Sequence, residues 1–543
     1  MGAVGSLSGC ADEVLGIPPE ARGPGQLVFP LGIEGLTDPS GSFLFVSSTN
    51  HNQAFTSGTI NAYDRLVLAR TVGTTTNFVD GSLISDPELD LRLNEDGTAV
   101  IGAGACRQQI VEPTIQSSFE TPEPLDLTAA FLMSIRTPSS GGRMRLIDGR
   151  LVFPTRFNQL LVFFDLNPGG ALAEFGTIPG PGSLISCLLE GEAPEPGIDC
   201  SSRFLLLLGE DDPFEVARVL DPSTGLEFLA VSHLEPPTGS GAGVSMVPVS
   251  RIEARLSGGP LDPTLPVVAR VLGLQGGTGI EFAGSLAPEM EDTLFLGSTF
   301  PISGISQLAA LSTTDLAAAR RNPFIQEGPL DTNDVDFDPS TVIPTANVNL
   351  TGLSAASSVE GVVFAPAADG LPNRIYATVR IPEQIDSDNS AIIVLSFVDD
   401  RLQIESLLEV GEELGPPVLS PFSAPGQRWL YIPDVRGDRL YIVDVSTDRP
   451  LVLNELRGRF TLDTPTGSLS TFTLASPFGL FFDEQSFTVN GSSFLRRLLY
   501  VTNFENSTLA VVDVTDANPA VHCLVARLGS VFDATTDPEE DTL

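Results

Sequence analysis

The best candidate metal ligands in the sequence belong to an acidic run that includes Asp334, Asp336 and Asp338. Alternate carboxylates in one loop can converge on Ca²⁺, a hard cation that takes roughly six to eight oxygen ligands. The standard calcium-binding loop is absent, because it would need a glycine at its sixth position and a glutamate where Thr345 stands. A calcium site and a solvated acidic loop are the two interpretations, and no other cofactor is predicted.

The cysteines offer a second chemistry. Cys187 and Cys200 flank an acidic, proline-rich segment, and a disulfide between them would close that loop. In the chain-entropy model such a bridge stabilises the fold by about 3 kcal/mol. Cys106 and Cys523 form a second candidate pair, and buried free thiols are the alternative for all four. Because no Cys-x-x-Cys motif occurs, these cysteines are not expected to bind metal.

Cys10 bears on the location of the protein. The segment from Leu7 to Cys10 resembles a bacterial lipobox, in which Cys10 would carry the lipid. No basic or apolar region precedes it, so a working signal would require a start upstream of Met1, and a chance match is the alternative. Ala11 after the cysteine favours the outer membrane. No apolar run approaches the ~20 residues of a spanning helix, so no transmembrane helix is predicted and only a lipid anchor would join the protein to a membrane.

Residues suited to catalysis are sparse. The three histidines are His51, His233 and His522, and no Gly-x-Ser-x-Gly elbow, Walker loop or dinucleotide fingerprint occurs in a suitable context. Four arginines within or beside expected strands would either bind a carboxylate or sugar acid in a central channel or pair with acids of neighbouring repeats: Arg136, Arg156, Arg374 and Arg436. The catalytic residues stay unknown, and the sequence leans towards a protein that is not an enzyme.

The strands that would position these residues recur as a hairpin pattern. The runs 499–503 and 509–513 are apolar stretches that end in polar or acidic residues and are joined by a short polar turn, as adjacent antiparallel strands are, and 430–434 with 440–444 repeat the pattern. Aromatic or aliphatic anchors mark eight such units, of which Val100 is the least typical: Phe45, Val100, Phe153, Phe228, Phe295, Tyr376, Tyr431 and Tyr500. Four short strands with their turns need roughly 40 to 50 residues, so each interval fits one unit with insertions.

These units predict an all-β fold, a single β-propeller of seven or eight four-stranded blades, over residues 26–530. Residues 1–25 would form an N-terminal tether with the lipid anchor, and residues 531–543 an acidic disordered tail. Two packed β-sandwich domains are the alternative. Against that alternative, no proline-rich or charged linker divides the middle of the chain.

The run Tyr500-Val501-Thr502-Asn503 resembles the namesake motif of the YVTN β-propeller repeat family, whose relatives include lactonase-like propellers, YncE-like periplasmic proteins and surface-layer proteins. Other copies depart from it, as Tyr431-Ile432-Pro433-Asp434 shows, so the resemblance concerns the fold. It implies seven blades as the usual number. It also implies ring closure between the first strand and the last blade, for which residues 26–29 and 521–525 are the candidates.

Charge excludes several partners. All 29 basic residues are arginine and the formal net charge is −40, so the surface repels nucleic-acid phosphates and anionic lipid headgroups. We therefore expect an exported binding or scaffolding protein, periplasmic or lipid-anchored at the outer membrane and cell surface, with an envelope protein or glycan as partner. The alternatives are a lactonase-like hydrolase with its site at the channel mouth and a structural surface-layer component. Acids converging with His or Arg in the channel would favour the hydrolase.

Overall fold

The computed structural model describes most of the chain between Leu27 and Gly529. The described residues are 27–49, 58–75, 127–138, 141–156, 159–208, 212–234, 242–259, 267–271, 274, 276–298, 307–319, 341–350, 353, 357–382, 388–457, 459–464, 467–472, 474–489 and 492–529. Several predictions fall outside them and are not tested: the tether at 1–25 with Cys10, the tail at 531–543, Cys106, His51, Val100, and the acidic run with Asp334, Asp336 and Asp338.

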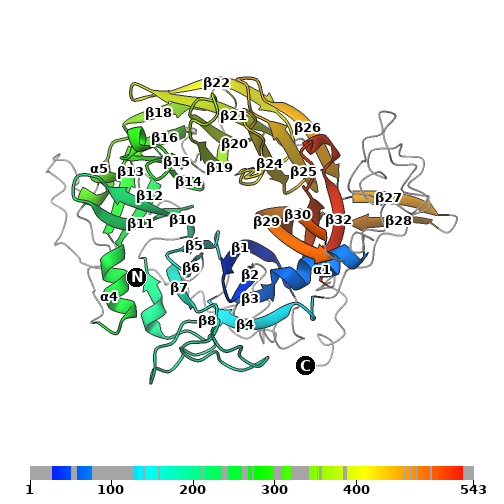
Figure 1. Cartoon of the computed structure of the whole chain (residues 1–543). Helices are drawn as coiled ribbons and strands as arrows, with labels where there is room; N and C mark the ends of the chain where they lie inside the picture. The colour runs from blue at the N-terminus through cyan, green and yellow to red at the C-terminus, as the bar shows by residue number, and fades with distance from the viewer. Residues whose placement is uncertain are drawn as a thin grey trace, which may run out of the picture.

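Within the described residues, seven sheets with at least four strands each stand around a common axis as the blades of a β-propeller (Figure 1). The all-β prediction is confirmed, and the number of blades is seven. In each blade the four main strands follow one another in sequence order from the axis outwards and pair antiparallel. Each sheet packs one face on the preceding blade and the other face on the following blade, so the hydrophobic core lies between blades.

The strands of blades 1 to 4 have the following bounds. Blade 1 contains β1 (Pro30–Asp38), β2 (Gly41–Ser48), β3 (Gly58–Asp64) and β4 (Phe131–Thr137); blade 2 contains β5 (Arg145–Ile147), β6 (Arg150–Thr155), β7 (Leu160–Leu166) and β8 (Ile185–Ser186), with β9 (Leu205–Leu207) also paired to β7; blade 3 contains β10 (Pro213–Asp221), β11 (Leu226–His233), β12 (Ala242–Pro248) and β13 (Val267–Val271), with β17 (Thr341–Val342) added in parallel; blade 4 contains β14 (Ile280–Phe282), β15 (Thr293–Gly297), β16 (Gln307–Ser312) and β18 (Ala346–Asn349).

The strands of blades 5 to 7 have the following bounds. Blade 5 contains β19 (Ser358–Ala365), β20 (Arg374–Pro382), β21 (Asp388–Val398) and β22 (Arg401–Glu409); blade 6 contains β23 (Val418–Leu419), β24 (Trp429–Asp434), β25 (Arg439–Asp444) and β26 (Leu451–Arg457); blade 7 contains β29 (Pro477–Val489), β30 (Ser492–Asn503), β31 (Thr508–Asp513) and β32 (Cys523–Leu528). Between blades 6 and 7, β27 (Arg459–Thr464) and β28 (Gly467–Phe472) form a separate hairpin that projects from the ring (Figure 1).

Among the described residues, helices are few and short. They are α1 (Arg65–Thr75), α4 (Val249–Leu256), α5 (Thr313–Ala318) and the 3₁₀ turns η4 (Ser202–Phe204), η5 (Pro288–Met290) and η6 (Pro519–Val521). In the part of the chain that the structure describes, none of the helices has the length and apolar character needed to cross a bilayer.

The predicted anchors lie on the second strand of every blade. Phe45, Phe153, Phe228, Phe295, Tyr376, Tyr431 and Tyr500 are all buried there. Each joins a hydrophobic cluster that spans at least two adjacent blades. The second strand is covered by a neighbouring blade on each face, and large apolar side chains are therefore the residues it needs.

The ring closes differently from the prediction. Blade 7 takes all four of its strands from residues 477–528, so residues 27–29 add no strand to it. The expectation that residues 26–29 pair with the last blade is therefore wrong for its described part. Instead, side chains of blades 1 and 7 share a hydrophobic cluster that includes Leu44, Tyr63 and Tyr500.

A buried ion pair joins the same two blades. Arg65, at the start of α1, pairs with Asp483 of β29, and both side chains are almost fully buried. The Arg65 guanidinium also donates to Thr37 Oγ1 at 3.0 Å and lies over the ring of Phe481, 5.2 Å from its centroid. Packing and this pair thus replace strand exchange as the means of closure.

Candidate functional site

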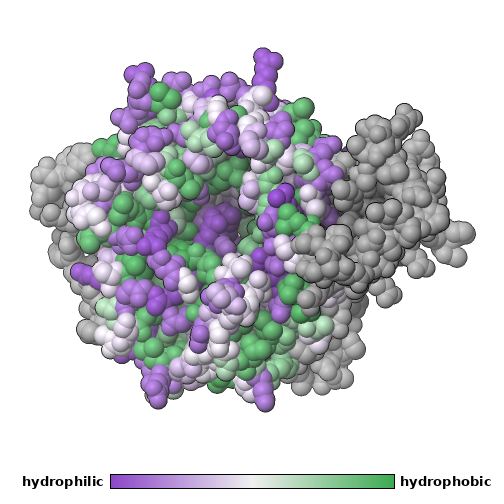
Figure 2. Space-filling view, viewed as in Figure 1, coloured by the Kyte–Doolittle hydropathy of each residue, from purple (hydrophilic) through white to green (hydrophobic). Residues whose placement is uncertain are grey.

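A cavity of about 290 Å³ lies between the first strands of blades 1, 2, 6 and 7. The face of the molecule seen in Figure 2 is hollowed at its centre, where hydrophilic residues lie at the bottom and apolar residues around them. Fifteen residues line the cavity, and only three of them are ionisable: Glu34, Arg143 and Arg145. The cavity therefore has a definite charged part, and the rest of its lining is largely apolar.

The two arginines are held by one buried carboxylate. Arg143 Nη1 lies 2.6 Å and Arg145 Nη2 lies 2.5 Å from the same oxygen, Oε1 of Glu215. The other oxygen of Glu215 accepts the backbone N–H of Ile280 at 3.3 Å. Glu215 is 1% exposed, so it lies behind the arginines and out of the cavity. Charge-assisted hydrogen bonds of this kind fix the guanidinium planes in place.

Local structure in blade 2 sets the position of the arginines. The β5–β6 turn contains Asp148 and Gly149, both with positive φ, as a tight two-residue hairpin requires. On the other side of Arg145, the Arg143 N–H donates to Phe214 O at 2.8 Å, which ties the strand entry to β10. Gly142 makes this approach feasible, because a Cβ there would lie 1.9 Å from Phe214 O.

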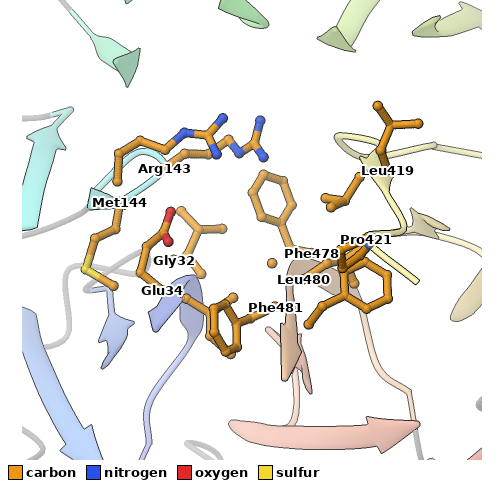
Figure 3. A pocket seen from close by; sticks show the side chains of 15 residues that line it. Gly32, Glu34, Arg143, Met144, Leu419, Pro421, Phe478, Leu480 and Phe481 are labelled. Carbon is orange, nitrogen blue, oxygen red and sulfur yellow. The ribbon is translucent and has the colours of Figure 1, made fainter. Parts of the chain in front are cut away.

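Glu34 faces these arginines from β1. Burial raises its pKa to about 7, although Arg145 and Arg143 act in the opposite direction. Among the described residues Glu34 makes no ion pair with either guanidinium, so the carboxyl and the arginines stand apart. Figure 3 shows Glu34 below Arg143 on the same side of the cavity. A carboxyl that titrates near neutrality beside fixed cations is typical of functional sites.

A second carboxyl of this type lies in blade 4. Glu281, on β14, has its pKa raised to about 7, first by burial and also by Glu215, while Arg145 and Arg143 lower it. Its carboxyl also accepts a hydrogen bond from the backbone of Phe364 on β19. Glu281 does not line the cavity. Its charge interacts with Arg143 and Arg145, which do line it.

The opposite wall of the cavity is apolar. Phe478, Leu480 and Phe481 of β29 line it together with Leu419 and Pro421 of blade 6, and Figure 3 shows Leu419 and Pro421 across the cavity from Arg143 and Glu34. Phe481 packs directly on the backbone of β1, where a Cβ on Gly35 would lie 2.0 Å from its ring. The cavity is thus amphipathic, with charge from blades 1 and 2 and apolar surface from blades 6 and 7.

The predicted disulfide is present. Cys187 and Cys200 are bonded, with their Cα atoms 4.7 Å apart, and both are buried in blade 2. Within the loop that the bridge closes, Glu192 accepts hydrogen bonds from Ser201 and Arg203. The bond is structural and lies away from the residues that line the cavity.

The structure does not bring the predicted polar candidates to the cavity. Three of the four arginines pair with acids of the next blade or its entry loop: Arg136 with Asp199, Arg156 with Asp212 and Arg374 with Asp448. Arg436 likewise does not line the cavity. For the first three, the interpretation as inter-blade ion pairs is confirmed.

The two described histidines are buried within the ring. His233 lies 2.8 Å from Ser245 Oγ, and His522 lies between Tyr431 OH at 2.6 Å and Asp516 O at 2.7 Å. Burial lowers the pKa of His522, which keeps it neutral. Among the described residues, no three His, Cys, Asp or Glu side chains gather as metal ligands would.

Sequence reasoning missed the residues of the charged wall, which is the part of the cavity lining formed by Glu34, Arg143 and Arg145, and missed Glu215, which supports it. Glu34, Arg143, Arg145 and Glu215 lie on or beside three first strands, far apart in sequence. The one local signal is the alternation of Arg143, Met144 and Arg145, which places two arginines on one face of a strand. The acids give no comparable signal.

Comparisons with known proteins add little to this geometry. No model of a protein family matches the sequence, and no curated protein matches it. Among solved structures, a candidate 6-phosphogluconolactonase from Bacteroides uniformis is 12% identical with a TM-score of 0.38, over 80% of this chain and 87% of that one. Hydrazine synthase of Kuenenia stuttgartiensis is 11% identical with a TM-score of 0.36, over 70% and 84%. AztD of Citrobacter koseri is 12% identical with a TM-score of 0.35, over 93% and 88%. At these scores the likenesses carry no argument about ligand or activity.

Proposed function

We propose that this protein is an exported ligand-binding propeller of the cell envelope that holds a small amphipathic molecule in its axial cavity. The observation that carries the proposal is the amphipathic lining, which combines Arg143, Arg145 and Glu34 with apolar residues that include Phe478 and Leu419. Ligand sites of proteins typically combine apolar walls with a few fixed polar groups. The ion pairs to Glu215 hold the arginines in place before a ligand binds. Little conformational entropy is therefore lost on binding.

Export rests on the cysteines. Disulfides persist mainly in oxidising compartments, so the Cys187–Cys200 bridge supports a location outside the cytoplasm. Lipid attachment at Cys10 remains a prediction from the sequence. Intact mass spectrometry of the protein from its own cells tests both: we expect an acylated chain that begins at Cys10 and gains about 2 Da on reduction of one disulfide. An unmodified chain with free thiols would contradict export.

Ligand binding is tested by thermal-shift screening of small amphipathic molecules. A ligand that binds the folded state alone raises the melting temperature, and above its Kd the stabilisation grows with the logarithm of its concentration. We expect hits with wild-type protein that disappear in Phe478→Ala, while Phe422→Ala serves as a control because Phe422 is not among the residues that line the cavity. If no compound shifts the wild type, or if Phe478→Ala responds like wild type, the cavity is not the binding site.

A lactonase-like hydrolase is the second candidate, favoured by the environment of Glu34. A carboxyl with a pKa near 7 can act as a general acid or base, and two guanidinium groups can stabilise an oxyanion. Hydrolysis of a panel of sugar and aliphatic lactones, followed by acid release, tests this function. Turnover that Glu34→Gln abolishes while ligand-induced stabilisation persists would favour the hydrolase, whereas no turnover on any lactone would leave binding as the function.

A further inference from the structure

The charged wall of the cavity has unused hydrogen-bond donors. A guanidinium has five N–H groups, and Arg143 and Arg145 each direct one nitrogen to Glu215 Oε1. Side-chain exposure is 16% for Arg143 and 32% for Arg145, and both line the cavity. Two guanidinium groups fixed side by side on a buried carboxylate match the geometry of an incoming oxyanion.

The charge of this wall depends on Glu34. The ionisable residues that line the cavity are Arg143, Arg145 and Glu34. Glu215 and Glu281 do not line it, but their charges act on the two arginines. With Glu34 protonated, the wall carries two positive charges, which Glu215 and the ionised form of Glu281 partly balance. With Glu34 ionised, the carboxylate opposes any anion placed beside the arginines. Protonated Glu34 would also donate a hydrogen bond to that anion.

The apolar wall sets the rest of the ligand. Phe478 lines the cavity together with Leu419 and Pro421, and Figure 3 shows Leu419 and Pro421 across the cavity from Arg143. A flat aromatic body fits such a wall, and a volume of about 290 Å³ limits it to a small molecule. We propose that the cavity binds an aromatic carboxylate together with one proton, which Glu34 takes up from solvent; this inference rests on the proposed function and deepens it.

Proton uptake by Glu34 makes the affinity for the carboxylate depend on pH. A free-state pKa of about 7 leaves Glu34 about one quarter protonated at pH 7.5, so complete protonation on binding takes up about 0.8 proton per ligand. Between pH 6 and pH 8.5 the affinity for the carboxylate falls by about thirtyfold, since only the protonated form accepts it. An uncharged ligand of the same shape shows neither effect.

Isothermal titration calorimetry with three matched probes tests the inference: 2-naphthoate, naphthalene-2-methanol and 2-naphthylmethylammonium. Titrations at pH 6 and pH 8.5 give the affinities, and titrations at pH 7.5 in Tris and triethanolamine give the proton uptake. Both buffers are cationic or neutral and do not compete for the arginines. We expect the acid to bind best at pH 6, to weaken about thirtyfold at pH 8.5, and to take up about 0.8 proton at pH 7.5.

Variants assign the effects to residues. Glu34→Gln should hold the acid equally well at both pH values and abolish proton uptake, because glutamine mimics the neutral carboxyl. Arg145→Gln should remove the preference for the acid over the alcohol. Arg150→Gln is the matched control, since Arg150 pairs with Asp165 and Glu253 and does not line the cavity. If Arg145→Gln fails to fold, the pH profile of Glu34→Gln still decides.

The outcomes separate the inference from the function on which it rests. If the alcohol or the amine binds as tightly as the acid at pH 6, or if the acid binds without a pH dependence, the inference is wrong. Loss of that binding in Phe478→Ala would then keep the cavity as a ligand site. If none of the three probes binds at either pH, both the inference and the proposed site are overturned.

Discussion

Removal of the Asp483 side chain should open the ring between its first and last blades. Asp483 Oδ1 accepts a hydrogen bond from Arg65 Nε at 3.1 Å, and side-chain exposure is 6% for Arg65 and 0% for Asp483. In Asp483→Ala the Arg65 guanidinium would remain buried without a counter-charge. Breaking a buried pair from one side costs about 3–5 kcal/mol. We expect the free energy of unfolding to fall by that amount.

A double variant and a matched control test whether the loss of stability comes from the buried charge. Because the cost comes from the charge left behind, the double variant Arg65→Met with Asp483→Leu should lose much less stability than Asp483→Ala alone. Glu484→Ala is the matched control: Glu484 is the next residue on β29 and pairs with Arg497 at 2.7 Å, but its side chain is 42% exposed. A surface pair of this kind contributes about 0–1 kcal/mol.

Urea denaturation followed by circular dichroism gives the free energies, and hydrogen exchange by mass spectrometry gives their location. Faster exchange in β1 and β29 of Asp483→Ala, with β19 to β22 of blade 5 unchanged, would place the loss at the closure. The reasoning is refuted if Asp483→Ala costs no more than Glu484→Ala, or if the double variant is as unstable as the single one.

Three further predictions concern stability. Replacing Cys187 and Cys200 by serine should lower the free energy of unfolding by about 3 kcal/mol, which matched urea curves would measure; an unchanged midpoint would show that the loop is ordered without its bridge. The pKa of Glu34 is raised on folding from 4.5 to about 7, so the folded state binds its proton more tightly and loses stability as the pH rises through that range. Glu34→Gln should therefore gain up to about 3 kcal/mol over wild type at pH 8 and almost nothing at pH 4, and equal differences at both would contradict the assignment. Phe295→Ala should cost about 3–5 kcal/mol because Phe295 is fully buried between blades 4 and 5, whereas exposed Leu286→Ala should change the melting temperature little.

The fold was predictable because its signal repeats along the chain. Each second strand needs large apolar residues on both faces, and the seven described anchors, such as Phe295 and Tyr431, all lie there. The eighth anchor, Val100, lies outside the described residues. The strands on either side of it, β3 and β4, pair with each other in blade 1. An insertion between paired strands can therefore mimic one more unit when only the spacing is known.

Ring closure was predicted less well, because it depends on contacts that do not repeat. The resemblance to a repeat family favoured strand exchange between residues 26–29 and the last blade. The actual closure uses Arg65 and Asp483, which are 418 positions apart and match no repeated pattern. An arginine after a strand and an aspartate within one are both ordinary in sequence, and only the fold shows that they meet.

The residues that line the cavity could not be predicted from the sequence for a related physical reason. First strands surround the axis, where two of them, β5 and β14, have only three residues each, too few for a periodic pattern. Their outward neighbours determine where they lie, so the first strands are free to differ in chemistry from blade to blade. This freedom allows Glu34, Arg145 and Phe478 to line the same cavity. The asymmetry of the lining, which the blade repeat does not require, is accordingly the part of the molecule where a function is best sought.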